Sequence, residues 1–531
     1  MLNSHACEVN AANQRTRQTF TAGNYADYGY DNIGQLTPAL GKVAGGRARI
    51  REDFTYSYDP GGNLFERQND QLEQDFYVNE LNEPRSVGRD SHLTAAGTTA
   101  SPATNVAVNG STATFCSDNT FPRRVTVNSD DVTLTAIAHD AYGRAEANVS
   151  ISYLPSTNSF VYDLNGNLRT NGTRVFDYDD ENELVAITEP AACKSEFLYD
   201  GKMRRCIRRE YVWQSGIWNL QSEIRYVYDG NLVIEERDSS NLPQVAYTRG
   251  KDLSGSLQGA GGIGGLLART SNSDLLSSIS SPSAHAYYHA DGNGNITCLI
   301  GGSQQIVAKY LYDPFGNTLS LSGPLAEANL YRFSSKEIHP SSGCLYSLYR
   351  FYEPNSQRWL NRDPLGDEVV VQEASRAYPP MYRDVLRYEG SGNLFTFNHN
   401  NPCGYVDSDG RGAITIPVGG VIIIGGVIIV TAVCYATPSC RDWLNRAAEG
   451  ILDRIKDVCK PKPKPPSNSC QDSTKNPTAA NCRSCCLWEY SVGSTGPARN
   501  EPQALETLKA CQQACDTSGG KEGPRFKYFL P

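Results

Sequence analysis

The sequence predicts a mainly β protein built from repeated β-hairpins, and two observations carry this prediction. The chain has 30 tyrosines against three methionines, and aromatic residues favour strands over helices. The dipeptide Tyr-Asp occurs seven times, with its tyrosine at Tyr30, Tyr58, Tyr162, Tyr178, Tyr199, Tyr228 and Tyr312. With 531 residues, of which 20% are charged and 39% hydrophobic, the chain has the composition of a folded protein with several domains.

Each copy of the repeat predicts a strand, a turn and a second strand. The clearest copies are YDPGGNL from Tyr58, YDLNGNL from Tyr162 and YDPFGNTL from Tyr312. In such a copy the Asp side chain accepts backbone N–H groups in the turn, Gly-Asn supplies a left-handed conformation, and Leu begins the return strand. A lone hairpin is only marginally stable in water, so we expect neighbouring copies to stack into a continuous sheet.

Two stretches interrupt the repeats. The first, from Ser91 to Thr120, is rich in Ala, Thr, Ser and Asn, and it fits either a decorated loop or a β insertion. The second contains five residues, GGIGG, from Gly261 to Gly265. Because no Lys-Ser or Lys-Thr follows them, we predict a flexible turn there rather than a phosphate-binding loop.

A block after the repeats carries a specific order of motifs. It contains FSSK from Phe333, YRFYEP from Tyr349, RWLNRDPLG from Arg358, NNP from Asn400 and DSDG from Asp407. This order resembles the RHS-associated core, which ends the Tyr-Asp (YD) repeat array of bacterial RHS proteins, toxin-complex C components and, more distantly, teneurins. The resemblance covers residues from about 24 to 410. The sequence departs from the family at an insertion over residues 367–391 and at Arg411, where many relatives have an apolar residue.

The resemblance implies a mainly β fold in which a spiral shell of YD-repeat hairpins is closed by an RHS-associated core, followed by a small α, Cys-rich C-terminal module. We therefore expect the YD shell over residues 1–333 and the core over residues 334–412. About ten hairpins can be recognised in the sequence, which predicts a partial shell.

The resemblance also implies a catalytic site, because the core of toxin-complex relatives is an aspartic self-protease that releases the C-terminal segment. The residues that match are Asp363 with Arg362 beside it, and an acid from the pair Asp407 and Asp409. Two carboxylates brought together tend to share one proton, so that one acts as a base and the other as an acid. The alternative is that these aspartates only cap turns, as their Asp-Pro and Asp-Gly contexts favour.

After Gly410 the composition changes abruptly. The segment from Ala413 to Ala436 has no charged residue and is long enough to span a bilayer, while its glycines and β-branched residues also fit a buried strand pair. We expect the apolar segment to occupy residues 413–437. A helix that begins near Ser439 and then a Lys/Pro spacer should follow it over residues 438–466.

The last predicted module, residues 467–531, is rich in cysteine. Equal spacing within the pairs Cys482/Cys486 and Cys511/Cys515 predicts two helices linked by disulfides. A zinc site formed by four of the module's thiolates is the competing interpretation. No histidine follows His399, which excludes His-dependent nuclease or protease chemistry contained within the tail.

The sequence therefore favours an RHS shell protein of the polymorphic-toxin type, secreted or in the cell envelope, although no signal peptide is visible. Its expected partners are its own tail inside or beside the shell, an immunity protein or a target-cell surface, and a membrane contacted by the segment from Ala413 to Ala436. The rival interpretation is a non-toxic surface protein for adhesion or carbohydrate binding. The net charge of −9 is spread along the chain and argues against a nucleic-acid partner. No cofactor is expected.

Overall fold

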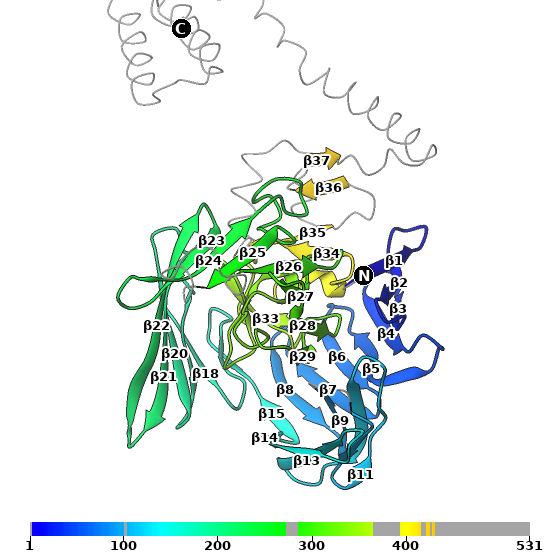
Figure 1. The fold of residues 1–531 in the computed structure, drawn as a ribbon. Helices are drawn as coiled ribbons and strands as arrows, with labels where there is room; N and C mark the ends of the chain where they lie inside the picture. Colours follow the sequence, from blue (N-terminus) through cyan, green and yellow to red (C-terminus); the bar gives the residue numbers. More distant parts are fainter. Residues whose placement is uncertain are drawn as a thin grey trace, which may run out of the picture. The chain divides into compact units, whose positions relative to one another are not determined.

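The computed structural model describes residues 3–99, 103–271, 285–364, 393–415, 421–424 and 427–430, the last three strands as backbone only. The predictions for residues 431–531 lie outside these residues, including the helix near Ser439, the disulfides and the alternative zinc site. The described chain is almost entirely strand and turn, which confirms the mainly β prediction. Figure 1 shows the strands following one another in antiparallel hairpins, in the order of the sequence.

Two large sheets, each a succession of antiparallel neighbours, contain most of the strands. The first has nine: β1 (His5–Val9), β2 (Arg15–Phe20), β3 (Tyr25–Tyr30), β4 (Leu36–Lys42), β5 (Ala48–Tyr58), β6 (Leu64–Asn69), β7 (Leu72–Val78), β8 (Pro84–Arg89) and β15 (Thr157–Ser159). It begins at β1 and ends at β15 without closing on itself.

The second sheet has fourteen strands and also stays open, from β16 to β29. These are β16 (Val161–Tyr162), β17 (Leu168–Thr170), β18 (Val175–Tyr178), β19 (Leu184–Glu189), β20 (Cys193–Tyr199), β21 (Arg205–Gln214), β22 (Ile217–Asp229), β23 (Leu232–Arg237), β24 (Pro243–Arg249), β25 (Leu266–Ser271), β26 (His285–Ala290), β27 (Ile296–Gly301), β28 (Ile306–Tyr312) and β29 (Thr318–Ser322).

The stretch that interrupts the repeats after β8 is a β insertion. Strand β9 (His92–Thr98) pairs with β12 (Thr120–Thr126), while β10 (Asn105–Val108), β11 (Ser111–Thr112), β13 (Asp131–His139) and β14 (Ala145–Tyr153) form a small sheet of their own. Since β15 returns to pair with β8, the insertion leaves the first sheet and rejoins it. Of the two alternatives left open by the sequence, the structure shows the second.

The turns have the predicted geometry. The Asp59 carboxylate accepts the backbone N–H of Asn63 at 2.8 Å and its side-chain amide at 2.9 Å, and Gly62 between them has a φ of +72°. The same geometry occurs where the sequence signal is weak: Asn79 replaces Asp and accepts the N–H of Glu83 at 2.8 Å. This degenerate copy keeps the turn because an asparagine oxygen accepts these hydrogen bonds as an aspartate does.

Tyrosine hydroxyls link consecutive copies. The hydroxyl of Tyr58 donates to the carbonyl of Leu36 at 3.0 Å, and that of Tyr199 donates to Leu184 at 2.7 Å. Tyr312 makes the equivalent bond to Ile296 at 2.7 Å. In each case the tyrosine that ends one strand reaches a residue that begins a strand in an earlier hairpin, so the repeats are joined by side chains as well as by the backbone ladder.

The block after the repeats packs against both large sheets. It contains a short sheet of β30 (Glu337–Ile338), β31 (Leu345–Ser347), β32 (Arg350–Glu353) and β33 (Arg358–Trp359), and the 3₁₀ turns η2 (Phe333–Ser335) and η3 (Asn398–Asn400). Tyr352 and Trp359 are buried in one hydrophobic cluster with Tyr56 of the first sheet. Phe351 is buried in a second cluster with Phe197 of the second sheet. Burial of these aromatic side chains holds the block in place.

Near the end of the described chain, β34 (Tyr405–Asp407) pairs with β35 (Ala413–Thr415), and β36 (Val421–Ile424) pairs with β37 (Val427–Val430). The parts of the apolar segment that the structure describes are thus strands. Across the described residues, no helix has both the length and the apolar character needed to cross a membrane. The seven cysteines up to Cys403 are free thiols.

Candidate functional site

Arg350, at the start of β32, contacts residues that precede and residues that follow the insertion at 367–391 in the sequence. Its Nη2 donates to Oδ2 of Asp363 at 2.7 Å, and its Nη1 donates to the carbonyl of Leu394 at 3.1 Å. Its Nε donates to the carbonyl of Gly410. The guanidinium carbon lies 4.1 Å from the centre of the Trp359 ring, and the side chain is only 2% exposed. One buried cation therefore contacts three separate segments of the chain.

Asp407, at the end of β34, lies on the other side of this guanidinium group. Its Oδ2 is 3.6 Å from Nη2 of Arg350. Its Oδ1 accepts the backbone N–H of Gly410 at 2.7 Å and that of Arg411 at 3.2 Å. Burial raises the pKa of Asp407 to about 6, although the Arg350 charge opposes the shift. This carboxyl group can thus hold a proton in mildly acidic solution.

Asp409 pairs with an arginine close to it in the chain. Its Oδ2 accepts from Nη2 of Arg411 at 2.7 Å. The Arg411 guanidinium in turn lies 3.9 Å from the centre of the Tyr349 ring. Arg411, which stands where many RHS proteins have an apolar residue, is therefore the partner of Asp409.

The guanidinium group of Arg362 lies 3.6 Å from the carboxylate of Glu83. The resemblance to the RHS core implied Arg362 as the arginine of the site, because it stands beside Asp363 in the sequence. In the structure, Arg350 binds Asp363 and approaches Asp407. Arg350 lies within the motif YRFYEP, so the motif was recognised but the role of its arginine was missed.

Lys336 also binds the turn formed by residues 407–410. Its Nζ donates to the carbonyl of Ser408 at 2.6 Å and to that of Gly261 at 3.3 Å. Burial lowers the pKa of Lys336 to about 8, against the opposing effect of Asp407 and Asp409. The lysine thus ties the turn to the Gly-rich stretch that the sequence predicted to be a flexible turn.

Two glycines allow the close approach. Gly261 has a φ of +61°, and a Cβ on it would lie 1.8 Å from the Ser408 carbonyl oxygen. Gly410 has a φ of +89°, and a Cβ on it would lie 2.7 Å from the carbonyl oxygen of Ser347. Any larger residue at either position would push the turn away from its neighbours.

The described residues hold no group of three or more His, Cys, Asp or Glu side chains that could bind a metal ion. The contacts of Arg350 and Asp407 suit proton transfer and charge stabilisation at the peptide bonds of residues 407–411. The Gly410 carbonyl contacts a cation, and the N–H of Arg411 contacts a carboxyl group whose pKa is raised.

Comparisons with known proteins give the following similarities. No protein-family model matches the sequence. The chain is 27% identical over 258 residues to the tRNA3(Ser)-specific nuclease WapA of Bacillus spizizenii, covering 48% of this chain and 9% of that protein. It is 23% identical over 219 residues to the double-stranded DNA deaminase toxin A of Burkholderia cenocepacia, covering 39% of this chain and 15% of that protein.

Among solved structures, the crystal structure of TcdB2-TccC3 matches 77% of this chain and 20% of that chain, with 17% identity and a TM-score of 0.34. The chain spans about a tenth of the length of the first curated relative, since the match covers 9% of it. Over less than half of its length, the chain is thus similar to a tRNA nuclease and to a DNA deaminase toxin.

Proposed function

We propose that this chain is the shell and core of an RHS-type polymorphic toxin, and that the core cuts the chain after Gly410 to release a C-terminal effector. The similarity to toxin proteins supports the carrier role. The contacts around residues 407–411 support the cleavage. The same proposal includes a spiral form of the shell, a location outside the cell or in its envelope, and partners such as an immunity protein.

The main support for cleavage after Gly410 is the environment of the peptide bond between Gly410 and Arg411. Its carbonyl oxygen accepts from Nε of Arg350, and its N–H lies 3.2 Å from Oδ1 of Asp407. A cation on the carbonyl oxygen stabilises the negative charge that develops there when water attacks the carbon. A protonated carboxyl group beside the nitrogen can donate to the departing amine.

Asp363 completes the set as the base. Its Oδ2 binds the same guanidinium group at 2.7 Å, so the carboxylate lies close to the carbonyl that Arg350 polarises. In the proposed reaction Asp363 takes a proton from the attacking water, and Asp407 gives a proton to the Arg411 nitrogen. The new carboxylic acid at Gly410 then returns a proton to Asp407, and the new amine at Arg411 takes the proton held by Asp363. The products are a carboxylate and an ammonium group, so atoms and protons balance.

Denaturing electrophoresis of the full chain tests this proposal. We expect two fragments in place of the 58.1 kDa chain, with Arg411 at the amino terminus of the smaller one. Asp363→Asn and Asp407→Asn should each leave the chain intact, because each removes a proton-transfer group. Asp200→Asn, in a repeat turn, is the matched control and should still be cut. An intact wild-type chain would show that these aspartates only cap turns.

A further inference from the structure

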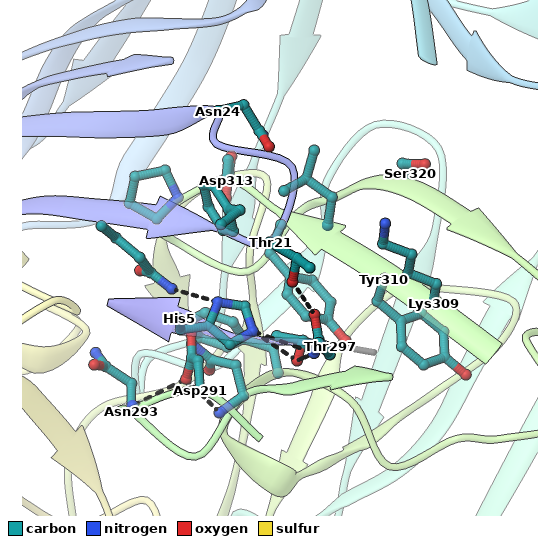
Figure 2. Close-up of a pocket in the computed structure, with 18 of the residues that line it drawn as sticks. His5, Thr21, Asn24, Asp291, Asn293, Thr297, Lys309, Tyr310, Asp313 and Ser320 are labelled. Atoms are coloured by element: carbon teal, nitrogen blue, oxygen red, sulfur yellow. Dashed lines mark hydrogen bonds between the residues drawn. The ribbon is translucent and has the colours of Figure 1, made fainter. Parts of the chain in front are cut away.

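A cavity of about 110 Å³ lies away from the Arg350 site and is lined by the N-terminal hairpin, by residues 291–297 and by strands β28 and β29. Figure 2 shows His5, Thr21 and Asn24 facing Thr297, Lys309 and Tyr310. Strand β1 is the first strand of its sheet and belongs to a different sheet from β27 and β28. Side chains therefore make the contacts across the cavity.

Polar side chains are held in fixed positions on one wall. Thr297 is hydrogen-bonded to Nε2 of His5 at 3.0 Å and accepts from the Asn3 amide at 2.8 Å. The other ring nitrogen of His5 is hydrogen-bonded to the Gln18 amide at 3.2 Å. The His5 and His289 rings lie 5.8 Å apart. These groups form a preorganised set of hydrogen-bonding atoms.

Arg15 is the buried cation of this cavity, with only 4% of its surface exposed. Its Nη1 donates to the Gln18 amide oxygen at 3.1 Å, and its Nη2 donates to the Asn293 amide oxygen. Its Nε is buried without a hydrogen-bond partner. Among the described residues, no ion pair joins Arg15 to a carboxylate: its hydrogen bonds go to neutral amide oxygens, and Asp291 acts on its charge only from a longer distance.

The carboxylates that border the cavity have other partners. Asp118 binds Arg49 at 2.8 Å. Asp291 and Asp313 each accept two backbone N–H groups of their own turns. Lys309, which is exposed, adds a second positive charge to the lining. Among the described residues, neither Arg15 nor Lys309 therefore has a carboxylate in direct contact, although Asp291 lies in the same lining.

We propose that this cavity binds a small organic anion, a carboxylate or a phosphate ester, whose charge is met by Arg15 and Lys309 and whose body packs against aromatic rings. A buried guanidinium group with no carboxylate in direct contact and an unpaired Nε is costly, and a charge-assisted hydrogen bond donated to a bound anion would offset that cost. The rings that line the cavity are those of Phe20, Tyr28, Tyr310, Tyr312 and Phe333.

His5 makes the binding depend on pH. Burial lowers the pKa of His5, His289, Arg15 and Lys309 lower it further, and Asp291 opposes them. An anion in the cavity favours the protonated imidazole. By linkage, the anion then binds more tightly as the pH falls and His5 becomes charged.

Calorimetric titration of the full chain with phenyl phosphate, benzoate and inorganic phosphate tests the proposal, at about pH 6 and about pH 8. We expect saturable binding of phenyl phosphate or benzoate that is tighter at the lower pH. The stronger of these two probes identifies the anion as a phosphate or a carboxylate. Saturation by inorganic phosphate alone would point to an adventitious ion only and would overturn the proposal.

Three variants make the test specific. Arg15→Gln should weaken binding about tenfold to a hundredfold, since it removes a charged hydrogen-bond donor. Lys309→Gln should weaken it several-fold, and because Lys309 is exposed this variant should fold. Arg17→Gln lies on the same strand but pairs with Asp27 at 2.6 Å, so it should bind like the wild type.

The proposal is overturned if none of the probes binds below about 10 mM. It is also overturned if Lys309→Gln and the wild type bind a probe with equal affinity at both pH values. The second criterion holds even if Arg15→Gln does not fold.

Discussion

Asp363 and Asp407 face the same nitrogen of Arg350, at 2.7 and 3.6 Å. In the sequence, Asp363 precedes the insertion at 367–391 and Asp407 follows it. Both lie beside the buried guanidinium group of Arg350. Their environments differ, because the Asp407 carboxyl group is 3% exposed and that of Asp363 is 17% exposed. Two carboxyl groups in unlike environments are suited to act as an acid and a base.

The first prediction is that self-cleavage slows as the pH rises. Asp407 must be protonated to donate to the Arg411 nitrogen, and its pKa is raised to about 6. The rate of fragment formation after refolding should therefore fall about tenfold per pH unit above that value. Gel densitometry over a pH series measures it. A rate that is constant from about pH 5 to 8 would remove Asp407 from the role of acid.

The second prediction concerns the pH dependence of stability at Lys336. Its pKa is lowered to about 8 in the folded chain from 10.5, so between these values the folded state binds fewer protons than the unfolded state. The free energy of unfolding must then rise with pH across this window, by up to about 3 kcal/mol from this group.

Lys336→Met should remove that rise, because methionine does not titrate. Denaturant unfolding of both proteins at about pH 8 and about pH 10 gives the comparison, and the difference between them cancels the other titrating groups. Parallel pH profiles would mean that Lys336 titrates normally.

The third prediction concerns the buried carboxylate of Glu337. It accepts from Arg205 at 2.5 Å, from Arg208 at 2.6 Å and from the Tyr226 hydroxyl at 2.9 Å. Glu337→Gln would leave the buried guanidinium group of Arg205 without its counter-ion and would leave Arg208 with Glu210 alone, so it should destabilise the chain by about 3–5 kcal/mol. Glu327→Gln, whose side chain is 83% exposed, should be nearly neutral. Chemical denaturation followed by tyrosine and tryptophan fluorescence would show whether the two variants differ.

The fourth prediction concerns Gly261. A methyl group there would lie 1.8 Å from the Ser408 carbonyl oxygen, so Gly261→Ala should displace the turn formed by residues 407–410. We expect faster hydrogen exchange at Ser408–Gly412 and slower self-cleavage. Gly45→Ala is the matched control, because a Cβ at Gly45 meets nothing within 4 Å. Equal exchange in the two variants would contradict the close contact between Gly261 and the turn.

The sequence by itself determined the hairpins. A repeat turn depends on residues four apart, as where Asp163 accepts the N–H of Asn167 at 2.9 Å, and such local contacts leave a visible pattern. The sequence also located the motif YRFYEP, which contains Arg350, and the separate motifs that contain Asp363 and Asp407. The contacts of Asp363 and Asp407 with Arg350, however, join residues on different elements of the chain.

Only the tertiary structure decided those partners. Arg362 is next to Asp363 in sequence, yet it lies near Glu83, while Arg350 approaches both Asp363 and Asp407. The reason is geometric: the burial of Trp359 and Tyr352 sets how the core block lies against the sheets, and this position determines which cation each carboxylate meets. For the same reason the cavity beside Arg15 had no sequence signal, because its lining comes from the first and the last strands of the repeat array.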